Sequence, residues 1–246
     1  SVFNLFQTHH KTTVLSYAPS ITHPMPKLKN NTDTRPDWRK AVRKAMQQAT
    51  EQEIVDRFGS LDNASFNYRW EHVQSVVTLA MRLGEMTGAD LKVVEAAAWL
   101  HDVRKSAGDA HPIEGAKFAR EFLPETDFPK KKIERVATAI EDHMGLWREE
   151  PLTNLESMVL WDADKLAKIG LTAVFHWTGL ALAGNKSRTL SDLIERGRSA
   201  EWQARTVASM HTEPARQAAQ SRLKAYNWLW NTLEAELNGD DLTESW

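Results

Sequence analysis

Four polar side chains with metal-binding chemistry occupy inward-facing positions in this sequence. His72 lies near the start of WEHVQSVVTLAMRLG, whose apolar residues recur every three or four positions on the face that carries the histidine. His101 and Asp102 follow the apolar run VVEAAAWL, and Asp162 lies on the apolar stripe of LESMVLWDADKLAKIG. A single inward histidine is most often a core residue with one hydrogen-bond partner. Four such groups on three predicted helices would each need a buried partner, whereas one cation satisfies them together.

A divalent metal ion is the cation that this set of side chains favours. An ionised carboxylate at Asp162 would cost several kcal/mol in an apolar interior unless a positive charge met it. The chain has no cysteine, so histidine and carboxylate are the protein ligands it offers to a transition metal. Adjacent helical residues point about 100° apart, which lets His101 and Asp102 hold one ion from two sides. We therefore predict that His72, His101, Asp102 and Asp162 bind one ion.

Helices must position these ligands, because we find no strand-like run of alternating residues and no internal repeat. The predicted fold is all-α, a multi-helix bundle around a buried metal site. Apolar periodicity, with proline and glycine at the ends, predicts the following helices. They span residues 36–58, 69–87, 90–104, 112–123, 129–144, 154–169, 171–183, 189–198, 200–211 and 213–238.

The chain divides by composition into three parts. Residues 1–35 lack periodicity and predict an extended or partly disordered N-terminal arm. Residues 36–185 predict the helical catalytic domain, and residues 186–246 predict C-terminal helices that pack on the same domain. The last helix has an apolar stripe that could pack within the chain or against a second copy, so monomer and homodimer both remain open.

Composition limits the class of partner. The 246 residues are 41% hydrophobic and 26% charged, and the formal net charge is -2. Such a chain has no basic field to attract a nucleic-acid polymer or an anionic membrane. The sequence begins without a basic leader, and its most apolar stretch is too short for a bilayer. We expect a soluble cytoplasmic protein whose partner is a small molecule.

The order of five blocks resembles the HD-domain phosphohydrolases. The blocks FNYRWEH, AAAWLHDVRK, HPIEGAKFA, AIEDHMG and LWDADKLAKIG lie within residues 66–170. The family pattern is a histidine, a His-Asp doublet and a distant aspartate, here His72, His101-Asp102 and Asp162. The resemblance is to an uncharacterised, predicted-hydrolase type. It implies a divalent ion in a helical bundle and hydrolysis of a phosphoester or phosphoanhydride in a small phosphorylated substrate, very often a nucleotide.

The mixed nitrogen and oxygen ligands favour a transition metal over magnesium. We expect Mn²⁺ first and Fe²⁺ next, with Co²⁺, Ni²⁺ or Zn²⁺ as further possibilities. Lys105 matches a lysine that often follows the family's doublet, and His111 precedes a predicted helix start where anions collect. We predict catalytic roles for both, with His111 as a phosphate contact or a proton donor.

Three further residues are predicted to contact substrate. Arg69 stands three residues before His72 and has the geometry to clamp a phosphate. Lys165 stands three residues after Asp162 and can either pair with that carboxylate or reach a phosphate. His143 shares an inward face with apolar residues, which leaves it open as a substrate contact, a partner of a ligand or a ligand of a second ion.

Two other functions remain open. Some relatives on the same helical scaffold hold two irons and oxidise their substrates, and extra histidines between the doublet and the last aspartate mark them. His111 and His143 stand in that interval, but His111 follows Asp102 by only nine residues, so we favour one ion. The second alternative is a regulatory module that binds a nucleotide without turnover.

Overall fold

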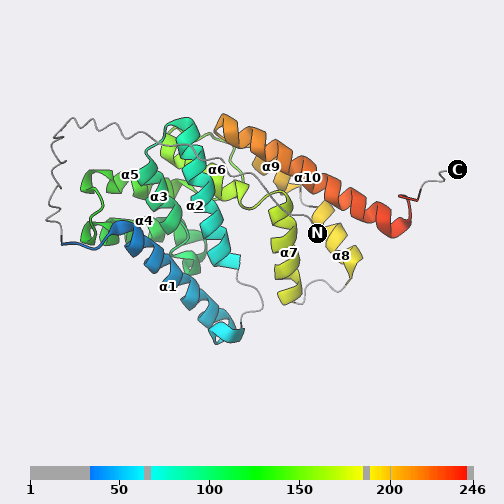
Figure 1. The fold of residues 1–246 in the computed structure, drawn as a ribbon, viewed down its shortest axis with the longest axis horizontal. Coiled ribbons are helices and arrows are strands. Elements are labelled where there is room, and N and C mark those ends of the chain that lie inside the picture. The colour runs from blue at the N-terminus through cyan, green and yellow to red at the C-terminus, as the bar shows by residue number, and fades with distance from the viewer. Residues whose placement is uncertain (1–33, 64–67, 185–188, 200, 243–246) are drawn as a thin grey trace, which may run out of the picture. The chain divides into compact units, whose positions relative to one another are not determined.

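The computed structural model describes residues 34–63, 68–184, 189–199 and 201–242, and the regular elements in these ranges are all helices (Figure 1). The all-α prediction is therefore confirmed for this part of the chain. The N-terminal arm predicted over residues 1–35 lies, apart from its last two residues, outside the described residues.

The helices in the first part of the chain are α1 Trp38–Phe58, η1 Leu61–Asn63, α2 Tyr68–Thr87, α3 Leu91–Leu100, η2 Lys105–Ala110, α4 His111–Phe122, η3 Leu123–Glu125, η4 Lys130–Lys132, α5 Ile133–Asp142 and α6 Leu155–Leu166. The later ones are α7 Leu171–Ala183, α8 Leu190–Arg198, α9 Trp202–Ala208 and α10 Glu213–Asn238. Polar side chains cap several of these helices: Asp37, Asp90 and Asn154 accept hydrogen bonds from backbone N–H groups in the first turns of α1, α3 and α6.

A difference from the predicted boundaries that bears on the site lies after α3. The periodic pattern predicts a helix to residue 104, but α3 ends at Leu100 and the chain turns through His101 and Asp102 into the 3-10 helix η2. Gly108 then adopts a φ of +60°, a conformation that glycine reaches without steric cost. The chain therefore reverses within a few residues of the His-Asp doublet, and α4 begins at His111.

The main core lies among α1 to α6. Helix α2 packs against α3 and α6, and α5 packs against α3, α4 and α6. Within this core α6 is the most enclosed helix, because every residue from Val159 to Leu166 is buried. Each fully buried aliphatic side chain of this core contributes roughly 1.5–3 kcal/mol to the free energy of unfolding. Because residues 159–166 of α6 do not reach solvent, their polar side chains must find hydrogen-bond or ion-pair partners inside the protein.

Helices α7, α8 and α10 form a second apolar cluster. Its buried members are Ala173, Val174, Ile194, Tyr226 and Trp230. Gly197 of α8 allows close approach to α10, since a Cβ at this position would lie 2.2 Å from the ring of Trp230. The Tyr226 hydroxyl donates a hydrogen bond to the Gly197 carbonyl at 2.8 Å. This cluster holds α10 beside α8 and α7 (Figure 1).

The C-terminal end of α6 is held by α9 and α10. The Arg222 guanidinium of α10 donates to the carbonyl of Leu166, one of the carbonyls at a helix end that lack a partner within the helix. The backbone N–H of Gly170 donates to the Gln203 side-chain oxygen at 3.3 Å. Gly170 has a φ of +77°, and a Cβ there would lie 2.7 Å from the Cβ of Arg222. Glycine is thus required at position 170, where the start of α7 meets α10.

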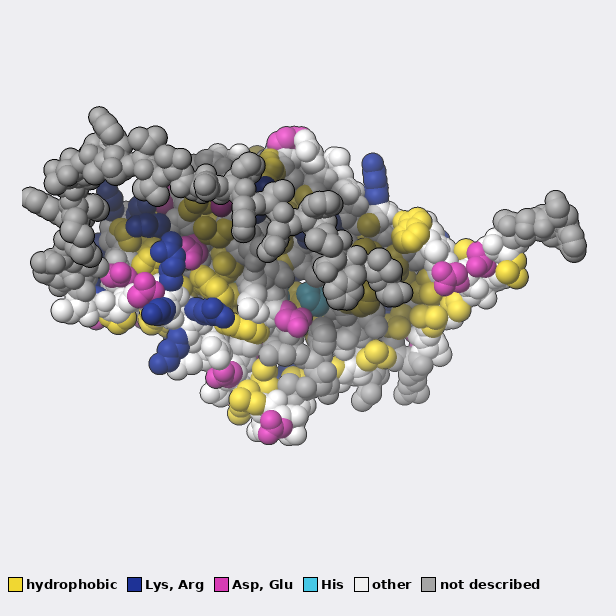
Figure 2. Space-filling model, in the orientation of Figure 1, with side chains coloured by type: hydrophobic (Ala, Val, Ile, Leu, Met, Phe, Trp, Pro, Cys, Tyr) yellow, Lys and Arg dark blue, Asp and Glu magenta, His cyan; other side chains and the backbone are white. Residues whose placement is uncertain are grey.

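The surface carries both signs of charge. On the face shown in Figure 2, lysine and arginine side chains gather over the part that contains α1, α4 and α5, with acidic and apolar side chains among them.

Taken singly, no described helix is both long and apolar enough to cross a membrane. Helices α6 and α7 together reach the required length and hydropathy, but the chain bends by 60° between them.

Candidate metal centre

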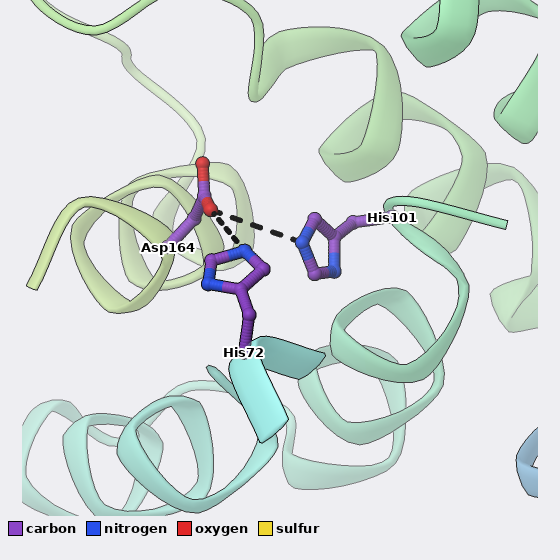
Figure 3. A group of neighbouring side chains, drawn as sticks. All are labelled: His72, His101 and Asp164. Carbon is purple, nitrogen blue, oxygen red and sulfur yellow. Dashed lines mark ion pairs between the residues drawn. The ribbon is translucent and has the colours of Figure 1, made fainter. Parts of the chain in front are cut away.

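Two histidines and an aspartate converge in the core from three different helical segments (Figure 3). His72 comes from α2, His101 from the turn after α3, and Asp164 from α6. The Nε2 atoms of His72 and His101 lie 3.1 and 3.8 Å from Oδ1 of Asp164. All three side chains are buried. We call His72, His101 and Asp164 the first group.

The atoms that face one another in the first group lack hydrogen bonds. Within the described part of the chain, neither Nε2 atom has a hydrogen-bond partner, and Oδ1 of Asp164 forms an ion pair with Nζ of Lys168 at 2.6 Å. The Nδ1–H of His101 donates to the carbonyl of Ala98 at 2.8 Å, which leaves its Nε2 as the lone-pair nitrogen of a neutral ring. Buried polar atoms without partners are rare in native proteins, and a cation between the two imidazoles and the carboxylate would satisfy both nitrogens. The residues present therefore fit a divalent metal ion.

The environment sets the protonation states that metal binding requires. Burial lowers the pKa of His72 to about 4 and that of His101 to about 3, so both rings are neutral at neutral pH. Burial alone would raise the pKa of Asp164, but Lys165 and Lys168 outweigh it and hold this pKa well below its usual value. The first group thus offers two neutral imidazoles and one carboxylate.

Asp102 borders the first group with one oxygen. Its Oδ2 lies 3.6 Å from Nε2 of His101 and 3.8 Å from Nε2 of His72, and it accepts a hydrogen bond from Arg69 at 2.5 Å. Burial would raise the pKa of Asp102, but His101 and Arg69 hold it well below the usual range. Asp102 is therefore an ionised carboxylate that can complete the first group.

The other oxygen of Asp102 faces a second set of side chains. Oδ1 lies 3.4 Å from Nε2 of His111 and 3.8 Å from Nε2 of His143, and these two nitrogens are 3.2 Å apart. Lys105 places its Nζ 3.2 Å from the same oxygen. Burial, with a smaller effect of Lys105, lowers the pKa of His111 to about 4. We call Asp102, His111 and His143 the second group.

Asp162, predicted as the fourth ligand, joins neither group, and the structure corrects this expectation. Its carboxylate accepts hydrogen bonds from the backbone N–H groups of His211 and Thr212, from the His211 ring and from the Thr212 hydroxyl, at 2.7 to 3.2 Å. Residues two apart on a helix point to nearly opposite sides, so Asp162 faces the start of α10 while Asp164 faces α2. Sequence periodicity missed Asp164 because α6 is buried all round, and both aspartates are inward.

The other predicted contacts are paired within the protein. Lys165 does pair with a carboxylate, but with that of Asp164, and its Nζ also donates to the His143 carbonyl at 2.9 Å. Arg69 bridges Asp102 and Glu53. Lys105 lies at the second group, with its side chain 30% exposed.

Two residues near the site were not predicted. Nζ of Lys168 lies 2.6 Å from Oδ1 of Asp164, at i,i+4 spacing along α6 and the turn after it. This spacing would have indicated the pair if Asp164 had been predicted as the ligand. The ring of Tyr68 stacks on His72 with centroids 5.2 Å apart. No sequence pattern marks this tyrosine, because its contact depends on how the first turn of α2 is placed.

Comparison with known proteins agrees with this geometry. Residues 69–169 match the HD domain, and this range contains every member of both groups. This segment, about two fifths of the chain, is therefore similar to the HD domain.

Two curated proteins are similar in sequence. The tRNA (cytidine(56)-2'-O)-methyltransferase of Thermoplasma volcanium is 27% identical over 180 residues, which are 64% of this chain and 46% of that protein. The chain thus spans less than half the length of that relative. The uncharacterized protein YpgQ of Bacillus subtilis is 26% identical over 204 residues, covering 75% of this chain and 92% of YpgQ.

Solved structures share the fold. The crystal structure of YpgQ aligns with a TM-score of 0.60 at 22% identity, over 83% of this chain and 97% of YpgQ. Its complex with ADP aligns with a TM-score of 0.57 at 23% identity, over 81% of this chain and all of YpgQ. A predicted HD superfamily hydrolase from an uncultured Thermotogales bacterium gives 0.56 at 20% identity, over 83% and 94% of the two chains.

Proposed function

We propose that this protein is a metal-dependent phosphohydrolase that cleaves a phosphoester or phosphoanhydride bond in a small molecule, with a nucleotide as the expected substrate. One observation carries the proposal: neutral imidazole nitrogens and carboxylate oxygens converge in the core without hydrogen bonds of their own. His72, His101, Asp102 and Asp164 are the proposed ligands. The match to the HD domain supports this assignment.

The donor set favours a transition metal, and we propose Mn²⁺. Two imidazole nitrogens with carboxylate oxygens suit manganese, iron, cobalt, nickel or zinc better than the all-oxygen surroundings that magnesium prefers. When bound, such an ion supplies Lewis acidity toward a phosphoryl oxygen and makes a water molecule more acidic.

The protein's own cations orient the substrate in this proposal. Lys105 is the most exposed of the basic groups that contact Asp102, so its ammonium is the one that an incoming phosphate reaches first. Arg69 would then hold a phosphate oxygen while it keeps its contact with Asp102. His111 lies next to Lys105, with its Nε2 3.1 Å from Nζ. Its Nδ1–H donates to the Gly108 carbonyl, so its Nε2 accepts a hydrogen bond from the ammonium and positions Lys105 toward the phosphate in this proposal.

A nucleotide is the proposed substrate class because YpgQ, which shares the fold, has been crystallised in complex with ADP. A nucleoside diphosphate carries both the anionic groups that Lys105 and Arg69 can contact and an anhydride bond that can be cleaved. The shape of the base-binding region is the property that separates one nucleotide from another.

A substrate screen tests the proposal. Purified protein is stripped of metal, reloaded with Mn²⁺ and assayed for product release from nucleoside mono-, di- and triphosphates and from a generic phosphodiester. We expect turnover of at least one nucleotide by the loaded protein and none by the stripped protein. If the loaded protein binds a nucleotide but leaves the whole panel intact, it is a regulatory binding module, and the hydrolase proposal fails.

The second group favours one alternative function, an oxygenase with two irons. Asp102 lies between the first and second groups, as a carboxylate shared by two ions would. Loading with Fe²⁺ under argon, followed by metal counting and dioxygen uptake, separates the alternatives. Two irons per chain with substrate-dependent consumption of dioxygen would support the oxygenase.

A further inference from the structure

The second group brings three hydrogen-bond acceptors together. The Nδ1–H of His111 donates to the Gly108 carbonyl at 2.6 Å, and the Nδ1–H of His143 donates to the Ile140 carbonyl at 2.5 Å. In a neutral imidazole the other nitrogen is then a lone-pair acceptor. The two Nε2 atoms face each other at 3.2 Å, with Oδ1 of Asp102 3.4 and 3.8 Å away.

Such a cluster needs a positive charge, and the chain supplies one. The Lys105 ammonium lies 3.2 Å from Oδ1 of Asp102 and 3.1 Å from Nε2 of His111, so it contacts two of the three members. Lys105 is held there by the backbone, because it is the first residue of η2 and its N–H donates to the Asp102 carbonyl at 3.0 Å. The i,i+3 spacing brings the lysine back to the aspartate.

A second divalent ion would need the same space. Metal–ligand distances to nitrogen and oxygen are about 2.0–2.2 Å, so an ion between these three acceptors would lie close to the point that the ammonium approaches. Two cations at such a separation repel each other, and both would need the same buried oxygen of Asp102. The ammonium must leave before the second group can bind an ion.

We propose that the Lys105 ammonium is the resident cation of the second group and keeps a second divalent ion out, so that the protein works with one ion and one lysine. The inference rests on the proposed function for the ion in the first group. It adds a specific role for Lys105: the lysine supplies, next to Asp102, a positive charge that can contact the phosphate and that a second metal would otherwise supply.

The test counts metal ions. Metal-free wild-type protein and Lys105→Met are titrated with Mn²⁺, and bound metal per chain is measured by equilibrium dialysis with elemental analysis and by electron paramagnetic resonance. We expect one Mn²⁺ in the wild type and two in Lys105→Met, where the second ion couples magnetically to the first. Lys105→Arg, which keeps the charge, should bind one. Lys168→Met should also bind one, because Lys168 contacts the first group instead.

A double variant locates the extra ion. Lys105→Met combined with His143→Ala should return the count to one, since His143 belongs only to the second group. Circular dichroism checks that each variant is folded, and Lys105→Gln serves as a second neutral variant if Lys105→Met is not. The inference is overturned if the wild type already binds two ions, or if no folded neutral variant gains one.

These outcomes are independent of the substrate screen. A wild type with one ion, a neutral variant with two and no turnover of any phosphorylated compound would retain the role of Lys105 and reject the hydrolase. Turnover by a wild type that holds two ions would do the opposite.

Discussion

Two aspartates of α6 stand two residues apart, are equally buried and do different work. Asp162 accepts hydrogen bonds from four donors at the start of α10, which satisfies both of its oxygens. Asp164 forms ion pairs with Lys165 and Lys168, and its Oδ1 also faces the Nε2 atoms of His72 and His101, which have no hydrogen-bond partner among the described residues. The partners of Asp162 are donors at the start of α10, whereas Asp164 faces two imidazole nitrogens that still need a partner.

The comparison teaches how to separate a structural carboxylate from a ligand-binding one. Burial alone does not separate them, because both side chains are inaccessible to solvent. The partners do: backbone N–H groups and a hydroxyl hold Asp162 in place, whereas Asp164 lies beside two imidazole Nε2 atoms that have no hydrogen-bond partner among the described residues.

Replacing Asp164 should have the largest effect. In Asp164→Ala the first group loses its carboxylate, so we expect Mn²⁺ affinity to fall by more than about 100-fold, beyond the usual cost of losing a residue that only supports a ligand. Turnover in the nucleotide screen should fall to background. Isothermal titration and the activity assay measure the two effects. Near-normal metal affinity in a folded Asp164→Ala protein would break the distinction between the two aspartates.

Replacing Asp162 should damage stability instead. In Asp162→Asn an amide NH₂ would face donors of α10, and the free energy of unfolding should fall by about 3 kcal/mol, as expected when a buried charged acceptor loses its hydrogen bonds. Urea unfolding measures this loss. The folded variant should still bind Mn²⁺ within about tenfold of the wild type. A variant of normal stability that cannot bind metal would reverse the assignment of the two residues.

Acid should destabilise the metal-free protein through the two histidines that face Asp164. His72 and His101 have pKa values of about 4 and about 3 when folded, whereas an unfolded histidine titrates near 6.5. Between these values the unfolded chain binds more protons, so the free energy of unfolding of the metal-free protein should decrease as the pH falls from about 6.5 to 4. The loss should be on the order of 2 kcal/mol for His72 and should shrink in His72→Leu. Urea unfolding at several pH values is the measurement. An equal loss in both proteins would contradict it.

Removing one of the four hydrogen bonds that Asp162 accepts should have the smallest effect. Thr212→Val keeps the shape of the side chain and removes a hydroxyl that donates at 2.7 Å, while the three other donors remain. We expect a loss of about 1 kcal/mol in the free energy of unfolding and unchanged Mn²⁺ affinity. Thermal unfolding with and without Mn²⁺ measures both, and a change in affinity would show that this contact reaches the first group.

The sequence predicts the helices well because periodicity and capping residues are local signals. It also predicts three side chains of the centre, His72, His101 and Asp102, whose helices are amphipathic enough to show which face is inward. Helix α6 has no exposed face between Val159 and Leu166, so periodicity cannot choose between its aspartates. That choice depends on where α2 and α10 pack, which is a property of the tertiary structure.

The second group was hidden for a different reason. His111 follows Asp102 by only nine positions, and on the sequence alone this spacing favours one ion and no second set of ligands. The reversal at Gly108 and the start of α4 return the His111 ring to the doublet. Separation along a chain gives no indication of a reversal that one left-handed glycine permits.

Helices α6 and α10 exchange hydrogen bonds in both directions, since Asp162 accepts from the start of α10 and Arg222 donates to the end of α6. The homologous segment stops at residue 169, before either partner. The segment similar to the HD domain is therefore shorter than the unit that folds. A fragment of residues 69–169 would lack the donors that bind the Asp162 carboxylate and the arginine that binds the end of α6.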